Sequence, residues 1–155
     1  MSTAGTWQTN STSSEATERL GQRLGKALKG GEVIELVSDL GGGKTTFVRG
    51  LAKGAQSHDK VASPTFTINK VYATDKFQIH HFDFYRLREA GLVADELSEV
   101  AGDPGVVVIV EWADVVQHVL PEDHLTICFE QTPTGEREII FKAPKSLDYL
   151  VKAVQ

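Results

Sequence analysis

The sequence has little cysteine, no long apolar run and no excess of basic residues. Its single cysteine, Cys128, excludes a disulfide within the chain, and its apolar surroundings suit packing as a small hydrophobic residue. No run approaches the ~20 apolar residues that a membrane-spanning helix needs. Residues 1–14 have neither the basic start nor the apolar core of a signal peptide. We therefore expect a cytoplasmic protein.

The formal net charge is −5. A protein that holds nucleic acid by itself usually carries a strongly basic face, so any RNA in the biology of this chain is expected to be held by a partner. The length of 155 residues and the hydrophobic share of 41% are those of one globular domain. We expect residues 1–12 to form a flexible polar tail and residues 13–155 to form a single domain.

Helical and extended patterns alternate along the chain. A helix of period 3.6 follows residue 14, with Thr12 or Ser14 as its N-cap, and it stops at Gly30. A further helix is expected over residues 86–100, interrupted by Gly91, and a short one ends at Pro121. The strands are expected at residues 32–37, 67–72, 77–82, 106–110, 125–130 and 137–142; the second and third could form a hairpin, and the last two pair antiparallel.

A glycine-rich loop joins the first of these strands to the helix over residues 45–53. Gly41, Gly42 and Gly43 permit positive φ angles and a close approach of the backbone to a ligand. Successive amides there can form a concave anion site at the positive end of the helix. Lys44 would bridge the β- and γ-phosphates of a nucleotide, and the Thr45 hydroxyl would face magnesium.

Three neighbours complete this loop: Asp39, Leu40 and Thr46 are further candidates for nucleotide contacts. The usual pattern begins with glycine six residues before the lysine, and Ser38 occupies that position here. Serine adopts strained backbone conformations less easily than glycine. An ordinary glycine-rich turn that starts a helix is the alternative explanation of the loop.

Glu111 directly follows the apolar run over residues 106–110. An acidic side chain at the carboxyl end of a buried strand lies where open α/β sheets bind ligands, and it could hold magnesium directly or through water. A solvated charge at a strand end fits the same position. Trp112, the next residue, is expected near the site, either against the nucleotide or in the core.

His81, Asp83 and Tyr85 alternate along an extended segment and so share one face. Asp83 could orient or deprotonate an attacking water or help to bind the metal ion, and a helix cap is its alternative role. His81 and its neighbour His80 are expected to be structural.

A hydroxyl on the loop after the phosphate-loop helix, Thr65, could sense a γ-phosphate, although a turn fixed by Pro64 is the simpler explanation. Arg137 and Ser14 are weaker candidates for nucleotide contacts.

Together these elements resemble the TsaE family of bacterial ATPases, which serve tRNA threonylcarbamoyladenosine modification. The resemblance runs from about residue 14 to 142 and rests on four motifs in the same order and spacing. They are DLGGGKTTF at residues 39–47, SPTFT at 63–67, HFDFYRL at 81–87 and EW at 111–112. Members of the family usually have glycine at the position of Ser38 and a small residue such as alanine at the position of Gly42.

The resemblance implies an α/β, P-loop NTPase-like three-layer domain with a central, mostly parallel sheet extended by antiparallel strands. It implies ATP or ADP and Mg²⁺ as cofactors, with Thr45 and Glu111 at the metal, Lys44 and Asp83 in catalysis and Thr65 in a switch-like loop. The implied partners are TsaB and TsaD, which transfer threonylcarbamoyl to adenosine 37 of tRNA while the ATPase supports repeated turnover. Contact with tRNA would be indirect, and no DNA or membrane is implied.

Two other functions are compatible with the same loop. A small-molecule kinase would need an acceptor pocket and a lid bearing arginines, for which residues 86–88 are the candidates. A nucleotide switch that does not hydrolyse would need only the binding loop. A GTPase fits less well, because Asn69-Lys70 lacks the following aspartate and falls too early in the chain for guanine selection. We expect slow hydrolysis in the absence of partners, because no arginine finger is evident.

Overall fold

The protein is described by a computed structural model over residues 3–38, 43–62, 69–85, 87–89 and 91–155. Seven strands form one sheet in the order β1-β7-β6-β2-β5-β4-β3. The strands are β1 (Thr3–Ser11), β2 (Val33–Val37), β3 (Asn69–Ala73), β4 (Gln78–Asp83), β5 (Val106–Glu111), β6 (Leu125–Gln131) and β7 (Arg137–Pro144). The helices are α1 (Ser14–Ala27), α2 (Lys44–Gly54), α3 (Gly91–Val100) and α4 (Asp148–Val154), with short 3-10 helices η1 (Ala113–Val119) and η2 (Lys145–Leu147).

The centre of the sheet is parallel and its two sides are antiparallel. β4, β5, β2 and β6 pair in parallel, whereas β3 pairs antiparallel with β4, and β7 pairs antiparallel with both β6 and β1. The fold class predicted from the sequence is thus confirmed, together with the antiparallel pairs β3–β4 and β6–β7.

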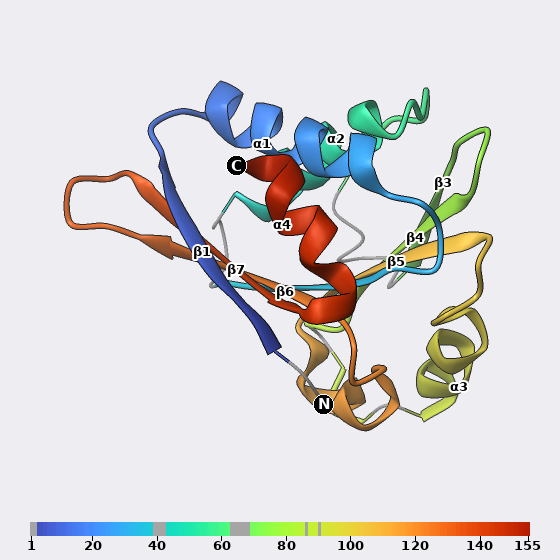
Figure 1. The fold of residues 1–155 in the computed structure, drawn as a ribbon. Helices are drawn as coiled ribbons and strands as arrows, with labels where there is room; N and C mark the ends of the chain where they lie inside the picture. The colour runs from blue at the N-terminus through green and yellow to red at the C-terminus, as the bar shows by residue number, and fades with distance from the viewer. Residues whose placement is uncertain (1–2, 39–42, 63–68, 86, 90) are drawn as a thin grey trace.

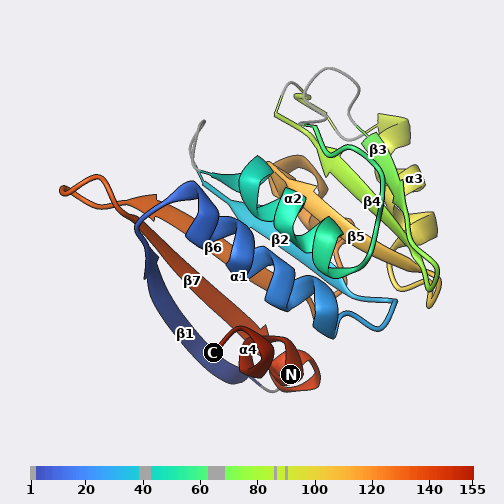
Figure 2. The same ribbon diagram turned by 90° about the horizontal axis from the view of Figure 1, so that it is seen from above.

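Helices cover both faces of the sheet. In Figures 1 and 2, α1, α2 and α4 lie over one face and α3 lies on the other. Two clusters of buried apolar residues fill the layers, one beneath α1, α2 and α4 and one beneath α3 and η1. β5 contributes alternate residues to each cluster and is buried along its whole length, as its apolar run predicted. Among the helices of the described ranges, none is long and apolar enough to cross a bilayer.

The first strand corrects one prediction. Residues 3–11 of the expected flexible tail form β1, which pairs with β7 along most of its length, and the ring of Trp7 lies 5.6 Å from that of Phe141. Exposed positions such as Gln8 and Asn10 alternate with the covered ones. An edge strand with one solvated face needs few apolar residues, so its composition is close to that of a loose polar segment.

Two helix starts also differ from the prediction. Neither Thr12 nor Ser14 caps α1; Ser13 is the N-cap, and its Oγ accepts the backbone N–H of Ala16 at 3.0 Å. Three hydroxyl residues in succession allow several caps, and sequence spacing does not choose among them. Gly91 begins α3 and does not interrupt it, with φ of 51°.

Four glycines bring α1 and α2 into backbone contact. A Cβ built on Gly21, Gly25, Gly50 or Gly54 would lie 2.0–2.2 Å from a backbone carbonyl oxygen of the facing helix, closer than side chains are found. Each helix thus carries two glycines four residues apart, turned toward the other helix. Since Lys44 begins α2, this contact fixes the candidate site relative to α1.

Candidate functional site

The candidate site lies where β2, β4 and β5 end and α2 begins. Gly43 is the N-cap of α2 and has φ of 93° and ψ of 9°, a left-handed conformation that glycine adopts without strain. The positive end of the 11-residue helix therefore faces the carboxyl ends of the parallel strands. In open α/β sheets this is where ligands bind.

Buried charged side chains meet at this end of the sheet. His81, Glu111, Asp83 and Lys44 are 0%, 3%, 4% and 6% exposed, respectively. The Nζ of Lys44 lies 3.6 Å from Oε1 of Glu111 and donates a hydrogen bond to the carbonyl of Ser38 at 3.4 Å. Because an isolated buried charge is costly, this pairing accounts for a lysine and a glutamate inside the protein.

Glu111 remains a carboxylate despite its burial. Burial alone would raise its pKa, but the hydrogen bond from His81 and the positive charges near it, including that of Lys44, outweigh burial and lower the pKa below 4.5. An ionised glutamate in this position can balance the charge of a cation. Lys44 already supplies one positive charge beside it.

His81 connects Glu111 to the neighbouring strands. Its Nε2 lies 2.5 Å from Oε2 of Glu111, and its Nδ1 lies 3.1 Å from the hydroxyl of Tyr72. Both of these contacts are with protein groups, and the expectation that His81 is structural stays a prediction. The prediction missed that one of these groups is Glu111.

Asp83 lies beside Glu111. The two residues are register partners in the parallel pair β4–β5, and both are buried. Oδ1 of Asp83 accepts the backbone N–H of Tyr85 at 3.0 Å, so Asp83 caps a turn and not a helix. The alternation predicted for His81, Asp83 and Tyr85 holds for the first two, which lie on the face of the sheet that α2 covers, whereas β4 ends at Asp83 and Tyr85 lies beyond the strand.

Trp112 closes the site above the lysine. The Nζ of Lys44 lies 4.7 Å from the centre of a Trp112 ring, and the ring of Tyr85 lies 4.9 Å from Trp112 on another side. The backbone of Trp112 is left-handed, with φ of 55° and ψ of 54°. This conformation is uncommon for a bulky residue, and here the indole lies against Lys44 while it also packs on the apolar cluster beneath α3 and η1.

Three more candidates lie at or close to the start of α2. Nε of Arg137 lies 3.7 Å from where a Cβ of Gly43 would be, so the guanidinium stands against the helix start. Thr45 and Thr46 are half-buried in the first turn of α2. Ser14 is exposed at the start of α1; the pairing of Ser11 with Arg137 brings this end of α1 to the same side of the molecule.

Five predicted site residues lie outside the described residues: Asp39, Leu40, Gly41, Gly42 and Thr65. Ser38 is described. Among the described residues, Gln56 and Trp112 are the non-glycine residues with positive φ, so Ser38 carries no left-handed strain where the usual pattern has glycine.

The donor set of the site suits a hard cation. Thr45 and Glu111 offer oxygen ligands, and Asp83 lies beside Glu111. Within the described part of the chain, no three acidic, histidine or cysteine side chains form a closed metal cage. Magnesium usually keeps several waters and binds through one or two carboxylates together with substrate phosphates, so an open site of this kind fits it.

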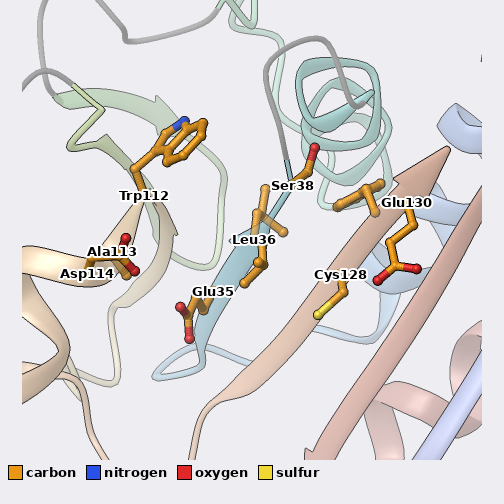
Figure 3. Close-up of a pocket in the computed structure, with 10 residues that line it drawn as sticks. Glu35, Leu36, Ser38, Trp112, Ala113, Asp114, Cys128 and Glu130 are labelled. Atoms are coloured by element: carbon orange, nitrogen blue, oxygen red, sulfur yellow. The ribbon is translucent and has the colours of Figure 1, made fainter.

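A pocket of about 340 Å³ adjoins the site between β2, β6 and η1. Trp112 and Asp114 lie on one side of it and Cys128 and Glu130 on the other (Figure 3). Between them lie Glu35 of β2 and Ser38, which directly follows that strand. Cys128 is half-buried there. The pocket opens next to the indole that covers Lys44.

The fold and the site define an α/β domain of the P-loop NTPase type: a parallel strand, a glycine-rich sequence, a helix that begins with a buried lysine, and an acidic residue ending the adjacent strand. The family model described as "Threonylcarbamoyl adenosine biosynthesis protein TsaE" matches residues 11–139, and the chain belongs to this family.

Curated relatives and a solved structure agree with this family assignment. The chain is 37% identical to the tRNA threonylcarbamoyladenosine biosynthesis protein TsaE of Bacillus subtilis (strain 168), a match that covers 83% of this chain and 80% of that protein. It is 38% identical to the TsaE of Treponema pallidum (strain Nichols), over 83% and 95% of the two chains. The crystal structure of Bacillus subtilis YdiB has a TM-score of 0.82 and 31% identity, and the match covers 97% of this chain and 94% of that one.

Sequence reasoning missed Tyr72 and the position of His81 beside Glu111. The alternation of His81 and Asp83 signals a shared face, but it does not say which strand lies next to β4. That neighbour is β5, whose residues pair with residues of β4 that lie 28 positions earlier in the chain, and this pairing depends on the fold. Tyr72 lies on the edge strand β3 and carries no motif of its own.

Proposed function

We propose that this protein is a slow, magnesium-dependent ATPase of tRNA threonylcarbamoyladenosine biosynthesis that acts with TsaB and TsaD. The observation that carries the proposal is the buried pair of Lys44 and Glu111, 3.6 Å apart, at the start of the helix that follows the glycine-rich loop. A lysine there suits the β- and γ-phosphates of a nucleotide. Membership of the TsaE family supports the biological process.

Lys44 would exchange partners when a nucleotide binds. In the described structure its charge is balanced by Glu111 and its Nζ contacts the Ser38 carbonyl. A phosphate group at the start of α2 would attract the ammonium away from Glu111, with the helix dipole acting in the same direction. The Glu111 carboxylate would then need another cation.

Thr45 and Glu111 are the residues that would hold magnesium. When bound, the ion would supply positive charge against the phosphate oxygens. Glu111 suits this role because its carboxylate stays ionised and its Oε1 faces Lys44, on the side where the phosphates would lie. The ion would thus take over the charge balance of Glu111 after Lys44 turns to the phosphates.

Asp83 would orient the attacking water and accept its proton. Its carboxyl group is buried beside Glu111 and is held in place by the N–H of Tyr85. Arg137, which stands against Gly43, would contact the nucleotide. Trp112 would cover the phosphates from the side opposite α2, as it covers Lys44 here.

Nucleotide binding is the first test. The chain has two tryptophans, so a Trp7→Phe background leaves Trp112 as the only indole reporter. We expect ATP and ADP to change the fluorescence of Trp112 with an affinity that magnesium raises, and GTP to bind more weakly. Lys44→Ala should weaken ATP binding by on the order of 10-fold or more, whereas Lys53→Ala, an exposed lysine of the same helix, should not. Equal affinities in all three proteins would refute a phosphate site at Lys44.

Turnover of the modification system is the second test. Purified TsaB, TsaD, threonylcarbamoyl-adenylate and tRNA are combined with and without this protein, and modified tRNA is counted per TsaD molecule. We expect repeated turnover only with the wild-type chain and ATP. An unchanged yield without the chain would refute the role in this system. Full support by Asp83→Ala would refute hydrolysis and leave a nucleotide switch.

A further inference from the structure

We propose that Tyr72 and His81 are positioning residues that commit one carboxylate oxygen of Glu111 to the protein, so that only Oε1 serves the nucleotide site. This inference deepens the proposed function and rests on it for its kinetic consequences. Its structural part concerns the protein without ligands and can be tested separately.

A chain of hydrogen bonds runs through three adjacent strands. The hydroxyl of Tyr72 on β3 lies 3.0 Å from the carbonyl oxygen of Ala62 and 3.1 Å from Nδ1 of His81 on β4. Nε2 of His81 lies 2.5 Å from Oε2 of Glu111 on β5. Tyr72 is 2% exposed and His81 is fully buried, so bulk water does not compete for these contacts.

The direction of the hydrogen bonds follows from the groups involved. A carbonyl oxygen only accepts, so the single hydroxyl hydrogen of Tyr72 points to Ala62. Burial raises the pKa of Tyr72 to about 12, which keeps that hydrogen in place. The Tyr72 oxygen must then accept from Nδ1–H of His81. The other ring nitrogen, Nε2, shares a hydrogen with Glu111.

The two oxygens of Glu111 are consequently unequal. Oε2 is held by His81, whose ring is in turn fixed by Tyr72, while Oε1 lies 3.6 Å from Nζ of Lys44. A carboxylate anchored through one oxygen cannot turn to offer both to a cation. Glu111 would therefore meet magnesium or its water through Oε1 alone, in an orientation set before the nucleotide arrives.

The surrounding sheet supports a positioning role. His81 pairs with Ile109 of β5, two residues before Glu111, so that both side chains emerge from adjacent strands on the same face. His80, the preceding residue of β4, points to the opposite face, where its Nε2 meets Gln78 at 3.2 Å. The adjacent histidines thus provide a functional variant and its matched control.

Nuclear magnetic resonance of the full chain without nucleotide tests the hydrogen bonds. With ¹⁵N-labelled histidine, we expect ring nitrogen signals of His81, one of them from a slowly exchanging Nδ1–H, that vanish in His81→Gln and persist in His80→Gln. Tyr72→Phe should shift the Nδ1 signal, and Glu111→Gln should shift the Nε2 signal. A ring of His81 without hydrogen on Nδ1, or one unaffected by Tyr72→Phe, would overturn the proposal, whether or not the protein proves to be an ATPase.

The magnesium dependence of ATP turnover tests the functional consequence of anchoring Glu111 through one oxygen. We expect Tyr72→Phe and His81→Gln to raise the magnesium concentration for half-maximal ATP turnover by about 10-fold or more, a size typical of residues that orient metal ligands. ATP binding without magnesium, followed by Trp112 fluorescence, should stay within about 2-fold of wild type, and His80→Gln should match wild type in both measurements. A lower thermal stability with unchanged magnesium dependence would reduce both residues to a structural role and refute the inference.

A double substitution separates this inference from the proposed function. If His81 acts through Glu111, His81→Gln should have no further effect on magnesium dependence when Glu111→Gln is already present. Additive effects would contradict a relay through Glu111. Failure of the wild-type chain to bind ATP would refute the proposed function and, with it, the kinetic part of the inference, while the spectra would still decide the hydrogen bonds.

Discussion

Asp83 and Glu111 are register partners at the carboxyl ends of β4 and β5, so two buried acidic residues end adjacent parallel strands beneath the start of α2. Glu111 is held by His81 and lies near Lys44, whereas Oδ1 of Asp83 accepts the backbone N–H of Tyr85. In the proposed ATPase, Glu111 would serve the metal ion and Asp83 would serve the attacking water.

Substitution of the two acids should therefore have different effects. Asp83→Asn is expected to lower the rate of ATP hydrolysis by on the order of 100-fold while magnesium-dependent ATP binding persists, because the carboxylate that takes the proton is lost. Glu111→Gln is expected to abolish the effect of magnesium on binding as well. Single-turnover hydrolysis and Trp112 fluorescence measure the two quantities. Identical profiles for the two variants would contradict these separate roles.

The ion pair of His124 and Glu35 should make stability depend on pH. A hydrogen bond to Glu35 raises the pKa of His124 above 6.5 against the opposing effect of burial. A raised pKa in the folded state means that the stabilisation is present below 6.5 and is lost as pH rises through the higher folded pKa. His124→Gln should thus destabilise the protein by about 1 kcal/mol below pH 6.5 and by less in alkaline solution.

Urea denaturation of both proteins on either side of that pH measures this difference. His58→Gln is the control, because His58 is exposed. A constant difference between wild type and His124→Gln at all pH values would show that the ion pair does not contribute.

The glycine contact between α1 and α2 should tolerate no side chain. Gly25→Ala would place a Cβ 2.1 Å from a backbone oxygen of α2 and force the helices apart. We expect a loss of at least about 1–3 kcal/mol in the free energy of unfolding and a lower melting temperature. Gly5→Ala, where nothing lies within 4 Å of the added Cβ, is the control and should be close to neutral.

Calorimetry of the two variants decides this point. Because α2 begins with Lys44, Gly25→Ala should also weaken ATP binding although Gly25 lies far from the strand ends. Equal melting temperatures for Gly25→Ala and Gly5→Ala would mean that the helices are not in backbone contact.

The pairing of β1 with β7 predicts that substitutions in β1 affect stability, which a loose tail would not. Trp7→Ala removes a ring packed 5.6 Å from that of Phe141 and should destabilise the protein by about 1–3 kcal/mol, less than a fully buried tryptophan because Trp7 is half-buried. Gln8→Ala, at an exposed position of the same strand, should change stability by less than about 0.5 kcal/mol. If Trp7→Ala proves equally neutral, β1 does not pair with β7 in solution.

The sequence was informative where one local pattern decides the outcome. The apolar run of residues 106–110 predicted a strand buried on both faces, and the glycine-rich loop predicted the start of α2 at Lys44 within one residue. The alternating histidine and aspartate of β4 predicted a shared face correctly. The resemblance to the TsaE family supplied the fold class.

The remaining features depend on partners distant in the sequence. β1 is polar because one of its faces is solvated, and only the pairing with β7 distinguishes it from a tail. The left-handed backbone of Trp112 and the contact of Tyr72 with His81 arise from tertiary packing, which overrides local preference. Gly21 and Gly25 lie inside a helix, where their spacing has meaning only once α2 is known to face them.

The pairing of β1 with β7 also bears on how the chain matures. Asn10 and Glu136 are 126 positions apart and meet across this edge. At a synthesis rate of about 5–20 residues per second, the first strand waits on the order of ten seconds for its partner to leave the ribosome. An unpaired apolar strand would be exposed to aggregation for that time. A hydrophilic strand such as β1 is less prone to aggregation than an apolar one during this delay.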